Sequence, residues 1–436
     1  MKYVSTGGQT PPTSFRSAVF AGLAPDGGLY IPESLPVLPH GFVSDLSGQN
    51  LQTIGAEVSS AFIDDISLDD LTALLTQAWT FPVPLVHLKD DLYLLELFHG
   101  PTLAFKDIGV RFLARIVSYY LQASDQDITI AVATSGDTGS AVAHGFFNVP
   151  RISVYVLYPS GKISPLQEQQ MATLGGNIHA LEVDGTFDDC QRLVKQALAD
   201  TEVVEARHLT TANSISLGRL LPQIAYYVWG VAQWKGAYRS GSKEVAPAFV
   251  VPSGNFGNLT AAVYAKAMGT PIGHLVAATN VNDAGAQYLR TGSFVPRTAV
   301  QTYSNAMDVG NPSNLARLES YFRGEADALR RRIEAVSISD EETLHEIRLT
   351  YEQCGRIVDP HTAVGVAAAR KHSGNGPTIV TATAHPGKFP EVVERALGFR
   401  IPLPDSLRGA IGRAKRSVEV SAEYEAFRQM LLNASR

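Results

Sequence analysis

The sequence predicts an α/β protein with mainly parallel sheets, flanking helices and an N-terminal subdomain. Three observations lead to this prediction. From Leu92 onward, short apolar runs alternate with amphipathic helical stretches, the pattern of a mainly parallel sheet. Most of these runs end in glycine, asparagine or serine, where open α/β sheets bind their ligands. Residues 1–85 instead mix glycine- and proline-rich loops with helical stretches such as Asp69–Trp79.

The apolar runs that are bounded by turn residues are predicted as strands. In chain order they are Ile128–Ala133, Ile152–Leu157, Ile178–Val183, Ala248–Val251, Leu275–Thr279 and Thr378–Thr383. We expect an N-terminal subdomain of residues 1–85, a smaller mobile domain of 86–175 and a large domain of 176–436. The charged stretch 311–356 carries no motif and is predicted as helical scaffold.

Composition excludes several classes of function. The 436-residue chain is 45% hydrophobic and 18% charged, which is typical of a globular protein of two or three domains. Its net charge of −6, without a basic patch, gives no indication of nucleic-acid binding. Cys190 and Cys354 are too few for a disulfide framework, and the histidines show no zinc-binding spacing. Without a long apolar run, we expect a cytoplasmic protein with no membrane partner and no metal.

Lys106 is the first candidate for a catalytic residue. It follows the apolar Leu103-Ala-Phe105 at the start of an amphipathic helical pattern. Most lysines in such a position are solvated surface residues, but an ammonium in an apolar setting is costly unless chemistry uses it. Lys106 is therefore a candidate amine nucleophile.

A glycine-rich turn far downstream is the second candidate. It reads Ser253-Gly-Asn-Phe-Gly-Asn258 and connects an apolar strand to a helix. Its glycines allow the backbone to approach an anion, and the helix directs its positive end to the same place. Such a turn alone is often a simple connection. Together with a reactive lysine it matches the needs of pyridoxal phosphate (PLP), and Gly254, Asn255, Phe256 and Gly257 are the predicted phosphate ligands.

A third segment, Thr134-Ser-Gly-Asp-Thr-Gly139, also joins a strand to a helix. A structural turn explains one glycine, but it does not explain hydroxyls, glycines and a carboxylate gathered at one helix start. This clustering indicates a second site for a polar ligand group.

Seven sequence words carry a resemblance to a known family. They are Gly22–Tyr30, Glu96–Asp107, Ala133–Gly139, Tyr158–Gln167, Leu174–Asn177, Val251–Gly257 and Thr383–Phe389. In sequence and in order they resemble the threonine synthase family of PLP enzymes, and they span essentially the whole chain.

The resemblance implies the fold type II of PLP enzymes, which is the tryptophan synthase β-like fold. It implies that Lys106 attaches covalently to the PLP cofactor and also acts as acid and base. The implied activity is that of a lyase that converts O-phospho-L-homoserine and water to L-threonine and phosphate by γ-elimination and β-replacement, the last step of threonine biosynthesis. A monomer or a weak homodimer is expected on the same basis.

The resemblance also assigns contacts with substrate and cofactor. Thr383 would give a hydroxyl to the pyridine nitrogen of the cofactor. The third segment would bind the α-carboxylate of the substrate, with Asp137 either taking part or only orienting the turn. Its residues are Ser135, Gly136, Asp137, Thr138 and Gly139.

Two cations inside matching segments are candidates for the phosphate of the substrate. Lys162 and Arg219 could pair with a dianionic leaving group, with help from Asn213 and Ser214. A solvated lysine and a structural ion pair are equally good interpretations of the two cations.

Two other functions stay open. A serine/threonine dehydratase, or a lyase acting on another phosphorylated amine, would share the lysine and the glycine turn. Only an enzyme that releases phosphate needs the cations. A non-catalytic protein that senses PLP would keep the turn but has no use for Lys106.

Overall fold

The computed structural model describes residues 1–46, 48–134, 136–237, 245–372, 374, 376–409 and 411–433. Within these ranges the chain forms two compact units, each built from separated stretches of sequence. Unit 1 comprises Met1, Pro32–Phe105 and Leu220–Leu403, whereas unit 2 comprises Lys2–Ile31, Lys106–Arg219 and Pro404–Arg436. The domains expected from the sequence are continuous instead. Their boundaries at residues 85 and 175 fall inside unit 1 and unit 2, respectively.

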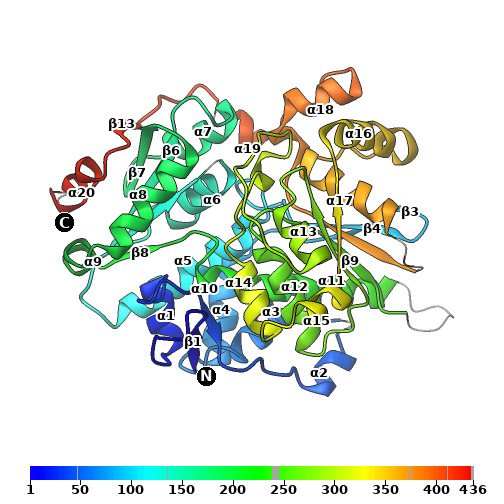
Figure 1. Cartoon of the computed structure of the whole chain (residues 1–436), viewed down its shortest axis with the longest axis horizontal. Helices are drawn as coiled ribbons and strands as arrows, with labels where there is room; N and C mark the ends of the chain where they lie inside the picture. Colours follow the sequence, from blue (N-terminus) through cyan, green and yellow to red (C-terminus); the bar gives the residue numbers. More distant parts are fainter. Residues whose placement is uncertain are drawn as a thin grey trace. The chain divides into compact units, whose positions relative to one another are not determined.

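Unit 1 contains a six-stranded sheet in the order β11-β10-β9-β12-β4-β3 (Figure 1). All neighbouring strands are parallel except β3 and β4, which form an antiparallel pair. Strands β9, β10 and β12 are buried along their whole length, as parallel strands covered on both faces should be. The strands are Leu85–Lys89 (β3), Leu92–Glu96 (β4), Ala248–Pro252 (β9), Leu275–Thr279 (β10), Ile333–Ser337 (β11) and Thr378–Ala382 (β12).

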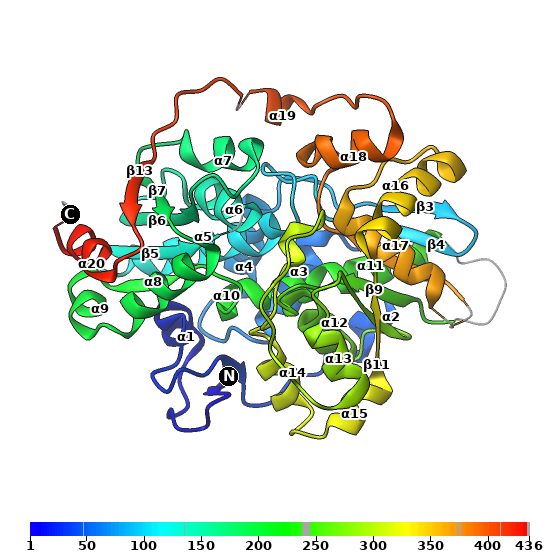
Figure 2. The same ribbon diagram turned by 45° about the horizontal axis from the view of Figure 1, so that its top comes forward.

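Helices α16, α17 and α18 pack together beside this sheet, and both views show them grouped (Figures 1 and 2). Their apolar faces and the sheet form a core that includes Val250, Val380, Ile347 and Val364. The helices of unit 1 are His40–Ser44 (α2), Leu51–Ser60 (α3), Leu68–Ala78 (α4), Gln223–Ala237 (α11), Gly257–Ala267 (α12), Ala284–Thr291 (α13), Leu315–Tyr321 (α14), Ala326–Arg332 (α15), Asp340–Cys354 (α16), Pro360–Lys371 (α17) and Pro390–Leu397 (α18), with short 3₁₀ turns at Asn305–Met307 (η1) and Pro386–Lys388 (η2).

Unit 2 contains a five-stranded, fully parallel sheet in the order β13-β7-β6-β5-β8. Helix α20 packs on α8 and α9, and Figure 2 shows it beside β13. The strands are Ile128–Ala133 (β5), Ile152–Pro159 (β6), Ile178–Asp184 (β7), Leu209–Thr211 (β8) and Val418–Ser421 (β13). The helices are Phe15–Ala21 (α1), Lys106–Gln122 (α5), Asp137–Phe146 (α6), Pro165–Ala172 (α7), Phe187–Ala199 (α8), Thr201–Arg207 (α9), Asp405–Arg408 (α19) and Tyr424–Asn433 (α20).

Three short elements complete the described chain. Tyr3–Ser5 (β1) and Tyr30–Pro32 (β2) form a two-stranded sheet, and Leu217–Leu220 (α10) is a single helical turn. No helix within the described ranges is long and apolar enough to cross a membrane.

The predicted α/β fold and all six predicted strands are confirmed, with β5 and β10 matching to the residue. The last of the six is one residue shorter than predicted, so Thr383 follows β12 instead of ending it. The stretch 311–356 is mostly helical as predicted, but it also contains β11.

Candidate active site

Lys106 is the first residue of α5, and its ammonium faces a carboxylate. Its Nζ atom lies 3.5 Å from Oδ2 of Asp137, and the two side chains are only 13% and 3% exposed. The amide of Gln167 donates to the other carboxylate oxygen of Asp137 at 3.0 Å. Both helices that carry the ion pair, α5 and α6, belong to unit 2. The predicted nucleophile is therefore a largely buried amine beside a buried carboxylate.

The turn that leads into α6 is closed by its own threonine. The hydroxyl oxygen of Thr134 accepts from the N–H groups of Gly136 at 2.9 Å and of Gly139 at 2.8 Å. Gly136 has φ 140°, and a Cβ there would lie 2.4 Å from the side chain of Gln167. Only glycine can therefore occupy this position without moving the site.

The residues that were predicted to bind the substrate carboxylate differ in their hydrogen bonds. The two glycine N–H groups donate to Thr134, so in this conformation they are not presented to a ligand. The hydroxyl of the half-buried Thr138 has no partner among the described residues. Asp137 binds Lys106, as an orienting residue would. Ser135 lies outside the described residues.

The turn between β9 and α12, in unit 1, is open at its N–H groups. Among the residues that the structure describes, none accepts a hydrogen bond from the first three N–H groups of α12, those of Gly257, Asn258 and Leu259. The preceding Phe256 takes the left-handed conformation, with φ 61°, which is strained for a bulky residue. A Cβ at Gly254 would lie 2.8 Å from Cα of Met307. The backbone here is shaped to present N–H groups, and its first glycine has no room for a side chain.

Asn258 is a residue that the sequence prediction missed in this turn. It is buried, and the hydroxyls of Tyr226 and Tyr227 on α11 both donate to its Oδ1. Its Nδ2 atom is buried and has no hydrogen-bond partner among the described residues. Burial raises the pKa of both tyrosines well above 10, so they remain donors. An amide donor is thus left for a ligand at the start of α12.

Thr383 lies just after β12 and is held by the segment that precedes Lys106. The N–H of Phe105 donates to the carbonyl of Thr383 at 2.9 Å, and Ala104 pairs with Ala384 as an isolated bridge. The buried Lys388 donates to the carbonyl of Thr102 at 2.7 Å and strengthens this connection. The Thr383 hydroxyl has no partner within the described part of the chain.

The predicted phosphate-binding cations are engaged with backbone. Lys162 is exposed and donates to the carbonyl of Gly185 at 3.0 Å. Arg219 is buried and donates to the carbonyl of Ala212 at 2.8 Å, and burial lowers the pKa of its guanidinium to about 10.

Asn213 is hydrogen-bonded to the end of β5, beside the turn before α6. Its amide group both donates to the carbonyl of Ala133, at 2.8 Å, and accepts from the N–H of the same residue, at 3.2 Å. It thereby fixes the residue that precedes Thr134. Ser214 follows and is half-buried.

A cavity of about 420 Å³ in unit 1 is formed by other residues. Its polar lining includes Glu96, His99, Arg356 and His385, and His99 bonds Glu96 at 2.7 Å. None of the predicted site residues lines it.

The sequence matches models of known protein families over most of its length. The sequence matches the family described as "Pyridoxal-phosphate dependent enzyme" over residues 76–384. It also matches "Threonine synthase N terminus" over residues 2–79 and "Threonine synthase, C-terminal" over residues 362–431.

Individual relatives cover nearly the whole chain. Threonine synthase of Escherichia coli is 42% identical over 96% of both chains. The crystal structure of the Escherichia coli enzyme superposes with a TM-score of 0.92, at 41% identity, and covers 99% of this chain and 100% of that one. The PLP-bound threonine synthase of Brucella melitensis superposes with a TM-score of 0.90, at 36% identity and 99% coverage of both chains. The chain therefore belongs to the threonine synthase family of pyridoxal-phosphate-dependent enzymes.

Proposed function

We propose that this chain converts O-phospho-L-homoserine and water to L-threonine and phosphate with PLP as cofactor. The observation that carries the proposal is the buried pair of Lys106 and Asp137, which holds an amine at a helix start 3.5 Å from a carboxylate. A buried ion pair seldom adds stability by itself, so a chemical role is the better explanation. The family match along the whole chain supports the choice of substrate.

The residues present fit the phosphate group of PLP. The open N–H groups at the start of α12 and the buried Nδ2 of Asn258 are donors that a dianion would satisfy. We propose that Gly254, Asn255, Phe256 and Gly257 hold this phosphate, and we add Asn258 to them. The side-chain oxygen of Asn255 already accepts from the N–H of Ser313, so its contribution comes from the backbone.

PLP, when bound, stabilises negative charge that develops on the carbon atoms of an attached amino acid. We propose that the Lys106 amine takes and returns the proton at the α carbon of the substrate. The carboxylate of Asp137, 3.5 Å from Nζ, would orient the Lys106 amine during these transfers. Thr383 would place its hydroxyl at the pyridine nitrogen.

The substrate contacts are proposals that rest on the turn before α6. The Thr138 hydroxyl is the donor that the described residues leave available for the α-carboxylate, and Ser135 would join it. Gly136 and Gly139 contribute the shape of the turn, because Thr134 occupies their N–H groups. For the leaving phosphate, Lys162 is the better candidate of the two cations, since it is exposed whereas Arg219 is buried. Asn213 and Ser214 would support this region.

The test is the absorption spectrum of the purified protein with PLP, followed by O-phospho-L-homoserine while threonine and phosphate are measured. We expect a visible band for the lysine-bound cofactor and equal amounts of the two products. Lys106→Ala should remove the band and lower kcat by at least about a thousandfold. Lys162→Ala is the matched control, which should keep the band and raise KM for the phosphorylated substrate.

Other outcomes point to other functions. A band with release of ammonia and a 2-oxo acid from serine or threonine, without phosphate release, would indicate a dehydratase. No band after addition of PLP would contradict the proposal as a whole. A monomer or weak homodimer in the cytoplasm remains a prediction that gel filtration and localisation can test.

A further inference from the structure

The cavity of about 420 Å³ in unit 1 lies at the carboxyl ends of two neighbouring parallel strands. Glu96 ends β4 and Ala382 ends β12, and these two residues are partners in the sheet register and both line the cavity. Residues 355–359, which lead into α17, line it as well. Open α/β sheets bind their ligands at this edge, and the volume is in the range of small-molecule sites. The position and size of the cavity are therefore those of a ligand site.

One cation and one anion of this cavity are incompletely paired. Nη1 of Arg356 lies 3.7 Å from Oε1 of Glu96, which is too long for a hydrogen bond. The other carboxylate oxygen of Glu96 accepts from Nε2 of His99 at 2.7 Å, so Oε1 is the oxygen that remains as an acceptor. Among the described residues, none accepts a hydrogen bond from the guanidinium of Arg356. A positive and a negative group are thus both available to a ligand.

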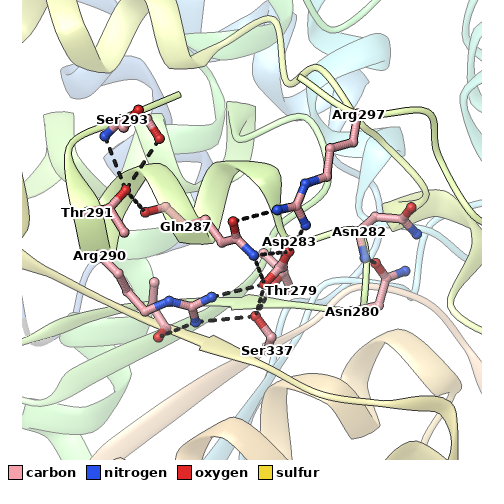
Figure 3. Close-up of polar contacts among 11 residues, drawn as sticks. Thr279, Asn280, Asn282, Asp283, Gln287, Arg290, Thr291, Ser293, Arg297 and Ser337 are labelled. Carbon is pink, nitrogen blue, oxygen red and sulfur yellow. Dashed lines mark hydrogen bonds and ion pairs between the residues drawn. The ribbon is translucent and has the colours of Figure 1, made fainter. Parts of the chain in front are cut away.

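Other arginines of unit 1 with a similar exposure are paired directly with an acidic side chain. Arg290, on α13, lies 2.9 Å from one carboxylate oxygen of Asp283, and Arg297 lies 3.3 Å from the other oxygen (Figure 3). Their side chains are 42% and 51% exposed, whereas that of Arg356 is 50% exposed. Exposure to solvent therefore does not explain why Arg356 lacks a hydrogen bond to the described residues.

Two further donors that line the cavity have no acceptor among the described residues. Thr362, on α17, is only 1% exposed, and its buried Oγ1 atom has no hydrogen-bond partner. Nδ1 of His385 accepts from the N–H of Gly387 at 3.0 Å, and burial lowers the pKa of the ring. The ring is therefore neutral at pH 7 and carries its proton on Nε2. Because buried polar atoms are nearly always paired, these donors indicate a ligand group that accepts hydrogen bonds.

We propose that this cavity binds a small α-amino acid with an aliphatic side chain. The carboxylate of the ligand accepts from Arg356, Thr362 and His385, and its ammonium group donates to Oε1 of Glu96. A zwitterion matches a cavity that has one incompletely paired charge of each sign. The side chain of the ligand contacts the apolar lining, which includes Leu94, Phe98, Val358 and Ile401. The inference does not rest on the proposed function, because the ligand contacts none of the residues proposed for catalysis.

Calorimetric titration of the purified protein, with PLP added, tests the two polar contacts separately. L-Leucine carries both charged groups, 4-methylpentanoate lacks the ammonium group, and 3-methylbutylamine lacks the carboxylate. Each charged group that is removed costs one set of charge-assisted hydrogen bonds. We therefore expect L-leucine to have a dissociation constant about tenfold lower than that of either other probe.

Two variants place this binding in the cavity. Arg356→Met removes the cation, so the dissociation constant for L-leucine should rise about tenfold. Arg290→Met is the matched control, because it removes an arginine of similar exposure in the same unit that pairs with Asp283. The control should leave the constant unchanged. In Glu96→Gln the partner of the ammonium group loses its charge, so L-leucine should bind no better than 4-methylpentanoate.

Several outcomes would overturn the inference. They are no binding of L-leucine to the wild type, equal constants in the wild type and Arg356→Met, and tighter binding of 4-methylpentanoate than of L-leucine. A shift of the visible PLP band that follows the same titration curve in the wild type and Arg356→Met would also do so, since L-leucine would then act at the cofactor. A protein that takes up no PLP but binds L-leucine as expected would contradict the proposed function and support this inference.

Discussion

Two turns of this molecule have the same local architecture and opposite hydrogen bonding. Each joins a buried parallel strand to a helix through a glycine-rich segment, β5 to α6 in unit 2 and β9 to α12 in unit 1. In the first turn, the Thr134 hydroxyl binds the N–H groups of Gly136 and Gly139. In the second, no described residue accepts from the first three N–H groups of α12.

The difference shows that glycine spacing alone does not define an anion site. Whether such a turn can bind an anion depends on whether a side chain of the protein already accepts the hydrogen bonds of the N–H groups at the helix start. In the turn before α6, Thr134 binds the N–H groups of Gly136 and Gly139, whereas the N–H of Thr138 has no acceptor among the described residues. The turn before α12, where we propose that a ligand binds, is held from behind by Met307 and Asn314.

The largest expected effect comes from filling the space behind the open turn. Gly254→Ala places a methyl group 2.8 Å from Cα of Met307, so backbone must shift. We expect a loss of about 1–3 kcal/mol in the free energy of PLP binding, measured by titration of absorbance. Gly236→Ala is the control, because a Cβ there meets nothing within 4 Å. Equal PLP affinity in both variants would mean that the turn does not need its observed shape.

A smaller effect is expected in the closed turn, and on a different quantity. Thr134→Val keeps the shape of the side chain but removes the acceptor for two N–H groups, so urea unfolding should show a loss of about 1 kcal/mol. PLP affinity should stay the same. Thr129→Val, in the preceding strand β5, removes a hydroxyl that makes no described hydrogen bond and should not destabilise the protein. Equal stability of the two variants would contradict the capping role.

The smallest expected effect is a pH dependence of the free energy of unfolding, caused by Asp308, which follows Met307 behind the turn before α12. Burial raises the pKa of Asp308 to about 6, from an ordinary value of 3.8. A raised carboxyl pKa means that the native state binds the proton more tightly than the unfolded state does. The stability from this group is therefore present at pH 4 and is lost as pH rises through 6.

Asp308→Asn removes this titration. The difference in free energy of unfolding between wild type and variant should be larger at pH 4 than at pH 7, as measured by urea unfolding. A difference that does not vary with pH would show that Asp308 titrates normally.

Much of the fold could be predicted from the sequence because parallel strands are buried on both faces. Runs such as Ile128–Ala133 are apolar throughout and stand out. The edge strand β11 was missed, since only its first residue, Ile333, is buried and the rest are partly exposed. The three-residue β8 was missed because it is too short to form a recognisable run.

The site could be predicted where its residues are close in sequence. Lys106 and the glycine turn at 254–257 were predicted from local context and resemblance, and their roles stay predictions. The contact of Gln167 with Asp137 links residues 30 apart, and that of Asn258 with Tyr226 links residues 32 apart, so no local pattern reveals them. Thr134 stands two residues before the N-cap residue Gly136, so the usual position of a capping threonine does not point to it.

The most direct test of this account is hydrogen exchange of the two turns, with and without inorganic phosphate or PLP, in the wild-type protein. We predict that the amides of Gly257, Asn258 and Leu259 exchange fast alone and slow down when either ligand is added. The amides of Gly136 and Gly139 should be protected in all samples. Protection of the α12 amides without a ligand, or equal responses of both turns, would contradict the claim that one turn is closed by the protein and the other by its ligand.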